Sequence, residues 1–202
     1  MSGADRPEWV VREDAGAAVL VALYLRGALG IRPPEELPSL RGVPTAGAAD
    51  DDEQRLRERQ WLAYWAMTVE PQAHPSPVPL ELVAGFETLA VVPVEGFDAL
   101  RTAMTPFAAD AVAYARRASE RYAQQSRGGS ASSYRAYASA IAEHERRVGR
   151  RAHSFELNVQ VLPLTQRGVW WIGSLTIAVT DGLRGDVAAF DPAIQPIIAE
   201  LA

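Results

Sequence analysis

Residues 149–161 read GRRAHSFELNVQV, and the spacing of the apolar residues changes within this stretch. From Phe155 to Val161 every second residue is apolar and the residues between are polar, as in a strand with one buried face. Before Gly149 the apolar residues follow helical spacing instead. The change predicts an α+β fold that is mostly helical, with a C-terminal β-hairpin.

The second strand of this hairpin is predicted over residues 169–180, after a connection at 163–168. Because that connection is short, we expect the two strands to be adjacent and antiparallel. A short terminal helix should follow, with its apolar side at Ile194, Ile197, Ile198 and Leu201. A lone two-stranded hairpin is only marginally stable, so it should pack on helices, recruit another strand or pair with another copy.

The chain before Gly149 predicts a series of helices, over residues 15–29, 53–69, 80–89, 97–104 and 105–125 and then from Ser130 or Ser132 to Val148. Asp14 is expected to cap the first helix, and Gly30 to end it. Each of the last two helices carries one apolar stripe, and two glycines separate them. We therefore expect these two to form an antiparallel helical hairpin.

The chain has 202 residues, of which 48% are hydrophobic, and this predicts a single domain over residues 1–202. A proline-rich connector at 71–79 divides it into a helical part, 1–70, and an α+β part, 80–202, which we expect to pack together.

Composition excludes several kinds of chemistry. There is no cysteine, which excludes disulfides, thiolate nucleophiles and cysteine-bound metals. All 20 residues counted as Lys or Arg are arginine, which excludes a Schiff-base lysine and a phosphate-loop lysine. We expect no cofactor. The net charge of −5 disfavours a general affinity for nucleic acid.

The start of the chain has no basic segment followed by an apolar one, so it does not resemble a secretory signal. The longest apolar stretch, residues 15–25, is about half of the roughly 20 residues that a membrane-spanning helix needs. The sequence therefore predicts a cytoplasmic protein without membrane contact.

Two histidines are candidate metal ligands. His144 lies on the apolar stripe of its helix, and His153 has the same strand parity as Phe155, so both could point inward. Glu120 or Glu145 could complete a site for zinc or a similar ion. The spacing matches no known motif, and ordinary packed or hydrogen-bonded histidines are the preferred interpretation.

The basic residues Arg146, Arg147, Arg150 and Arg151 form a cluster that could bind an anion or an acidic partner. The alternative, which we prefer, is that these arginines complement the dipole at the end of a helix.

Trp170 and Trp171 should lie on opposite faces of a strand, so one of them points away from the main packing face. They are candidates for an interface or a ligand site, although each alone is more typical of a core.

These observations favour a non-catalytic binding or assembly protein that self-associates through its β-hairpin or binds another protein. The alternative is a small-molecule-binding or metal-assisted hydrolytic enzyme that uses His144, His153 and nearby carboxylates.

Overall fold

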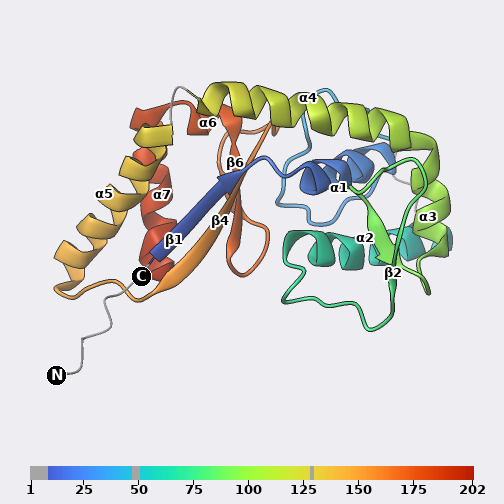
Figure 1. The fold of residues 1–202 in the computed structure, drawn as a ribbon, viewed down its shortest axis with the longest axis horizontal. Helices are drawn as coiled ribbons and strands as arrows, with labels where there is room; N and C mark the ends of the chain where they lie inside the picture. The colour runs from blue at the N-terminus through green and yellow to red at the C-terminus, as the bar shows by residue number, and fades with distance from the viewer. Residues whose placement is uncertain (1–8, 47–50, 128–129) are drawn as a thin grey trace.

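The computed structural model describes residues 9–46, 51–127 and 130–202, without the side chains of 130–133. Mixed helix and sheet is confirmed (Figure 1). The elements in chain order are β1 (Trp9–Asp14), α1 (Ala17–Ala28), α2 (Asp52–Val69), β2 (Leu80–Leu82), β3 (Val91–Pro93), α3 (Asp98–Met104), the 3-10 helix η1 (Thr105–Phe107), α4 (Ala108–Ser126), α5 (Ser130–Val148), β4 (Phe155–Leu162), β5 (Val169–Trp171), β6 (Thr176–Thr180), α6 (Asp181–Arg184) and α7 (Val187–Leu201).

The main sheet has four strands in the order β1-β4-β6-β5. β1, β4 and β6 are parallel, and β5 is antiparallel to β6. The C-terminal hairpin therefore exists, but it is formed by β5 and β6. The expected antiparallel pairing of β4 with the next strand is wrong, because β5 turns the chain back so that β6 runs alongside β4 in the same direction.

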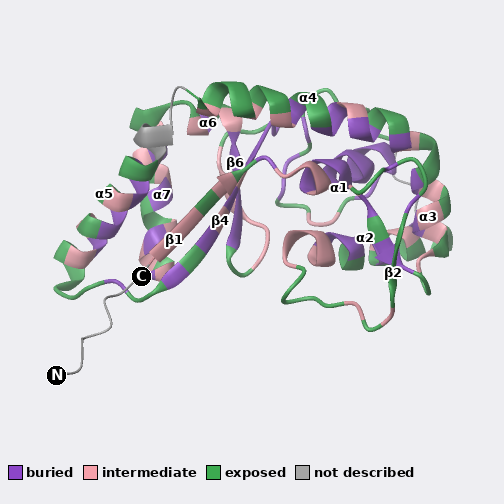
Figure 2. Cartoon of the chain, in the orientation of Figure 1, coloured by how far each residue is buried: buried purple, intermediate pink, exposed green. Residues whose placement is uncertain are grey.

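Each face of β4 and β6 packs on a different set of helices, as Figures 1 and 2 show. One face carries Leu157, Val159, Ile177 and Val179 and is covered by α5 and α7; we call this group the sheet core. Leu162 and Ala178 belong to the opposite side and pack with α1, α2, α3 and α4; we call this group the helical core. A sheet buried between helices on both faces explains why β6 is apolar at consecutive positions.

The helix α1 is surrounded on nearly all sides, as its continuous apolar sequence predicts. It begins after Gly16 instead of Asp14, so the expected cap is wrong; the Asp14 carboxylate accepts from the Ala15 N–H. On α2, the Trp61 indole N–H donates a hydrogen bond to the carbonyl of Ala22 at 3.0 Å and so links α2 to α1.

Among the described residues, no helix is both long and apolar enough to cross a membrane.

Residues 80–89 do not form the predicted helix. Leu80–Leu82 is the strand β2, which pairs antiparallel with β3. Gly85 and Glu87, between the two strands, have φ angles of 85° and 56°. Right-handed helices need negative φ at every residue, so the chain turns here instead.

The helices α4 and α5 do not form the predicted antiparallel hairpin. In Figure 1 they diverge, with α4 running along the top of the molecule above α1 and α5 descending beside α7. Their apolar stripes are real, but they face different cores: Ala111 and Tyr114 of α4 lie in the helical core, and Tyr137 and Ile141 of α5 in the sheet core. Periodicity shows that a helix has a buried side, not which element covers it.

Glu13, near the end of β1, has a carboxylate that accepts hydrogen bonds from three helices. Its Oε2 accepts from Tyr137 Oη of α5 at 2.9 Å and from Arg184 Nε of α6 at 2.8 Å. Its Oε1 accepts from Tyr122 Oη of α4 at 3.2 Å. The Glu13 and Arg184 side chains are only 14% and 13% exposed, so water screens the ion pair weakly.

The two tyrosines of this cluster resist ionisation. Burial first, and then the charge of Glu13, raises the pKa of both Tyr122 and Tyr137 above the ordinary value of 10.0. A raised pKa in the folded state means that their stabilising contribution is complete below pH 10 and is lost as the pH rises further.

We therefore expect Tyr137→Phe to lower the free energy of unfolding at pH 7 by about 1–3 kcal/mol, since the buried Glu13 carboxylate loses a donor. The difference from wild type should shrink above about pH 10, where the hydroxyl no longer favours the folded state. Urea denaturation at pH 7 and pH 10.5 measures both effects. Tyr134→Phe is the control, because Tyr134 is 61% exposed; equal stability of the two variants would contradict this role of Tyr137.

Candidate binding sites

Trp170 and Trp171 lie on opposite faces of the sheet, as predicted. Trp170 packs against the helical core and Trp171 against the sheet core, and both are half-buried. The Trp171 indole also donates to the Glu200 carboxylate of α7 at 3.2 Å. Each tryptophan thus anchors β5 to one core and keeps part of its surface in solvent. Their role in an interface stays a prediction.

Glu70, just beyond α2, holds the turn of this hairpin. Its carboxylate accepts from the Leu175 N–H at 2.8 Å and from the hydroxyls of Ser174 and Thr176 at 3.0 and 3.3 Å. Burial alone would raise the pKa of Glu70, but these hydrogen bonds outweigh it and lower the pKa. A Cβ added at Gly173 would lie 2.5 Å from the carboxyl carbon, so a larger residue here would displace the Glu70 carboxylate.

The two histidines have different environments. His144 is buried, as its place on the stripe of α5 predicts, and its Nδ1 lies 3.3 Å from Arg147 Nη2. His153 is exposed, and its Nε2 lies 2.9 Å from Arg150 Nη1. The expectation that both point inward is therefore wrong for His153. Because arginine can only donate, each of these ring nitrogens acts as an acceptor and its lone pair is already in use.

The two carboxylates proposed to complete a metal site have different environments. Glu120 is exposed on α4, whereas Glu145 accepts a hydrogen bond from the Ala152 N–H at 2.9 Å and shapes the turn before β4. Within 9–46, 51–127 and 130–202 no group of three or more His, Cys, Asp or Glu side chains could hold a metal ion. The metal alternative stays a prediction to which this part of the chain gives no geometric support.

The predicted basic cluster occupies the last turn of α5 and the loop after it, and all four arginines are exposed. Arg146 pairs with Glu143 on the same helix. Arg147 and Arg150 contact the two histidines. This arrangement fits cations that complement a helix C-terminus, and binding of an anion by this cluster, Arg151 included, stays a prediction.

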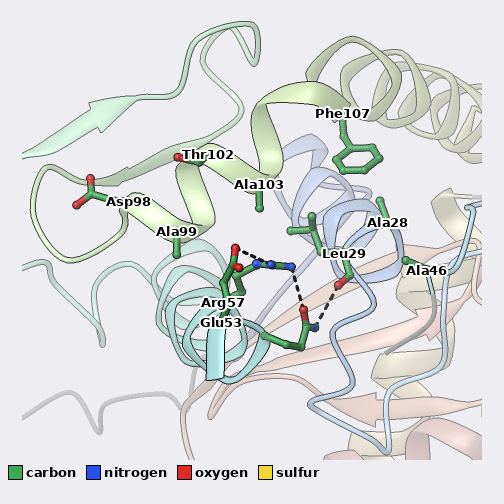
Figure 3. A pocket seen from close by; sticks show the side chains of 11 residues that line it. Ala28, Leu29, Ala46, Glu53, Arg57, Asp98, Ala99, Thr102, Ala103 and Phe107 are labelled. Carbon is green, nitrogen blue, oxygen red and sulfur yellow. Dashed lines mark hydrogen bonds and ion pairs between the residues drawn. The ribbon is translucent and has the colours of Figure 1, made fainter. Parts of the chain in front are cut away.

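The structure contains cavities that sequence analysis missed. The largest described one, about 660 Å³, lies between the end of α1, the start of α2 and α3 (Figure 3). Arg57 lies inside it, bonded to Glu53 at 2.7 Å and to the side-chain oxygen of Gln54 at 3.2 Å. The cation is paired with an exposed carboxylate of its own helix, and its Nε is buried without a partner among the described residues.

A second cavity, of about 450 Å³, lies between α1, α2 and the segment that contains β2 and β3. Its wall is mainly apolar, with a few polar side chains; it comprises Ala18, Tyr64, Met67, Thr68, Pro71, His74, Pro75, Ser76, Val78, Leu80, Thr88, Leu89 and Val91. Small-molecule sites typically have this size and this combination of an apolar wall with a few polar groups. We call it the Tyr64 cavity.

Tyr64 is the buried polar residue of this wall. Its side chain is 1% exposed, and its hydroxyl has no hydrogen-bond partner among the described residues. The Thr68 hydroxyl donates to the Tyr64 carbonyl at 2.8 Å instead. Burial raises the pKa of Tyr64, with a smaller opposing effect of Thr68, so the hydroxyl keeps its proton and can donate.

One feature of the sequence points to this cavity. The four prolines at 71, 75, 77 and 79 predict a stiff connector, and that connector forms one wall. Tyr64 itself looks like any apolar-face residue of an amphipathic helix.

The chain matches no protein-family model, and no curated protein or solved structure is significantly similar to it.

The Glu70 contacts give a testable prediction. Glu70→Gln should lower the free energy of unfolding by about 1 kcal/mol at pH 7, because charge-assisted hydrogen bonds become neutral ones. Because the pKa of Glu70 is lower in the folded state, its ionised carboxylate stabilises the fold at pH values above the unfolded pKa of 4.5. This contribution is lost as the pH falls through the folded pKa, so the difference in stability between wild type and Glu70→Gln should vanish in acid. Urea titrations at pH 7 and pH 3 test this, and a difference that persists at pH 3 would argue against it.

Proposed function

We propose that this protein is a non-catalytic binding protein that holds a small, largely apolar molecule in the Tyr64 cavity. The observation that carries the proposal is the Tyr64 hydroxyl, a buried donor without a partner in the wall of an apolar cavity. A buried hydroxyl without a hydrogen bond costs free energy, and a ligand acceptor would recover it.

The cavity also specifies the class of ligand. Its apolar wall favours an aromatic or aliphatic body, and a protonated tyrosine favours a neutral acceptor such as a carbonyl or ether oxygen. The charged groups described in this protein are mostly engaged elsewhere, as in the Glu13 and Glu70 clusters. A neutral ligand with one acceptor therefore fits better than an ion.

A second function, self-association, is favoured by the open edge of β5. This strand is the last in the sheet, and its N–H groups at Val169 and Trp171 point away from β6, because the bonded positions are Gly168 and Ile172. An unpaired edge is a template for another strand, and half-exposed tryptophan is typical of interfaces. We propose that two copies pair along this edge.

Because the chain lacks cysteine, neither proposal requires oxidising conditions, and we propose a cytoplasmic location.

Tyr64→Phe tests the binding function. Removing an unpartnered buried hydroxyl should raise the stability of the free protein by about 1 kcal/mol. It should weaken binding of acetophenone, an aryl ketone probe, about tenfold. Calorimetric titration and thermal unfolding measure the two effects.

If the Tyr64 hydroxyl had only a structural role, removing it would not both raise the stability of the free protein and weaken binding of the probe. Ala18→Phe, which fills the cavity from α1, should abolish binding of the probe. Binding of acetophenone that is unchanged in both variants would overturn the proposal, and so would the absence of any saturable binding to the wild type.

Val169→Pro tests self-association. Proline removes an N–H that faces outward and leaves the β5–β6 hydrogen bonds intact, so it should convert oligomer to monomer without loss of helical content. Val169→Thr is the matched control, because it keeps the N–H and the shape of the side chain. Native mass spectrometry reports the subunit number; a monomeric wild type at tens of micromolar would contradict the proposal.

A further inference from the structure

A third cavity contains a buried arginine that pairs with no carboxylate among the described residues. Arg26, near the end of α1, is 7% exposed. Its guanidinium donates to three backbone carbonyls, those of Leu37 at 2.6 Å, Arg32 at 2.8 Å and Pro34 at 2.7 Å. Its Nε is buried and has no partner among the described residues.

Carbonyl oxygens accept the hydrogen bonds of the Arg26 guanidinium but do not neutralise its charge. Burial lowers the pKa of Arg26, opposed by the charge of Glu36, which shows that its surroundings disfavour the cation. Arginine remains charged in proteins in spite of such a shift. A buried cation without a counter-ion is costly, and a bound anion would offset that cost.

The cavity beside Arg26 contains further donors. It has a volume of about 390 Å³ and is lined by Arg26, Gly27, Gly30, Ile31, Arg32, Glu35, Ser39, Thr45 and Ala46. Two arginines and one glutamate give the wall a net positive charge. The side chains of Ser39 and Thr45 add two hydroxyls that can donate. The cavity is separate from the Tyr64 cavity, with which it shares no wall residue.

We infer that this cavity is a binding site for a small oxyanion, a phosphate or carboxylate group, held by the buried Arg26 and by Arg32. Arg26 supplies its free Nε donor and a charge that water does not screen. Arg32 is exposed and lines the same cavity. The carbonyl end of α1 opposes an anion here, which explains why the site would need two arginines. The inference is independent of the proposed apolar ligand.

Titration of ¹⁵N-labelled protein with inorganic phosphate, and separately with acetate, at constant ionic strength tests this inference. We expect saturable shifts of the amide signals of Gly27, Gly30 and Thr45 with at least one of the two ions. Preference for phosphate would identify a phosphate ester as the natural group, and preference for acetate would identify a carboxylate.

Arg32→Gln should weaken this binding at least tenfold, and Thr45→Val should weaken it to a smaller extent. Arg32 is exposed, so neither substitution removes the buried contacts that Arg26 makes with the backbone. Arg135→Gln, on α5 across the sheet, has the same net charge as Arg32→Gln and should bind like wild type. Shifts that do not saturate, that persist in Arg32→Gln, or that concentrate at residues 146–151 would overturn the inference.

Discussion

The carboxylate of Glu13 joins parts of the chain that share few other contacts. It lies on an edge strand and receives donors from α4, α5 and α6, three helices that diverge in space. α4 belongs to the helical core and α5 to the sheet core, so the cluster connects the two cores at the end of the sheet. Burying this charge is tolerable because three donors surround it, one of them the Arg184 cation. Arg184 in turn lies 5.0 Å above the Phe190 ring. Removing any one donor leaves part of a buried charge unsatisfied.

Sequence periodicity identified the local elements better than their partners. The helices α2, α3, α4 and α5 and the strand β4 could be read from the spacing of apolar residues, with shifts of a few residues at the ends. β1 could not, because three of its six residues, Arg12, Glu13 and Asp14, are charged. The strand that pairs with it in the described sheet, β4, is also far away in the chain. Parallel pairing leaves no local signal, since the strands are not joined by a turn. The same limitation explains the wrong expectation for α4 and α5, whose stripes face different cores.

The geometry of the candidate sites could be predicted only where the alternation of side chains along a strand determines it. That Trp170 and Trp171 face opposite ways follows from strand geometry alone. The Tyr64 cavity does not, because it depends on the path of residues 71–91 over α2, and that path follows from positive φ angles at Gly85 and Glu87. The carbonyl contacts of Arg26 likewise depend on how residues 32–37 fold back on α1. An unsatisfied buried donor is a property of packing, and no residue pattern encodes it.

The distribution of satisfied and unsatisfied polar groups bears on the proposed binding function. General acid–base chemistry needs a titratable group within hydrogen-bond reach of the reacting atom. In the described part of the chain, structural donors occupy the carboxylates of Glu13 and Glu70, His144 and His153 contact different arginines, and only His74 lines a described cavity. The unpartnered buried groups in the described cavity walls are donors, namely the Tyr64 hydroxyl and the Nε atoms of Arg26 and Arg57. Arginine stays charged and burial keeps the Tyr64 hydroxyl protonated, so these donors can orient a ligand through hydrogen bonds, as the proposed binding function requires.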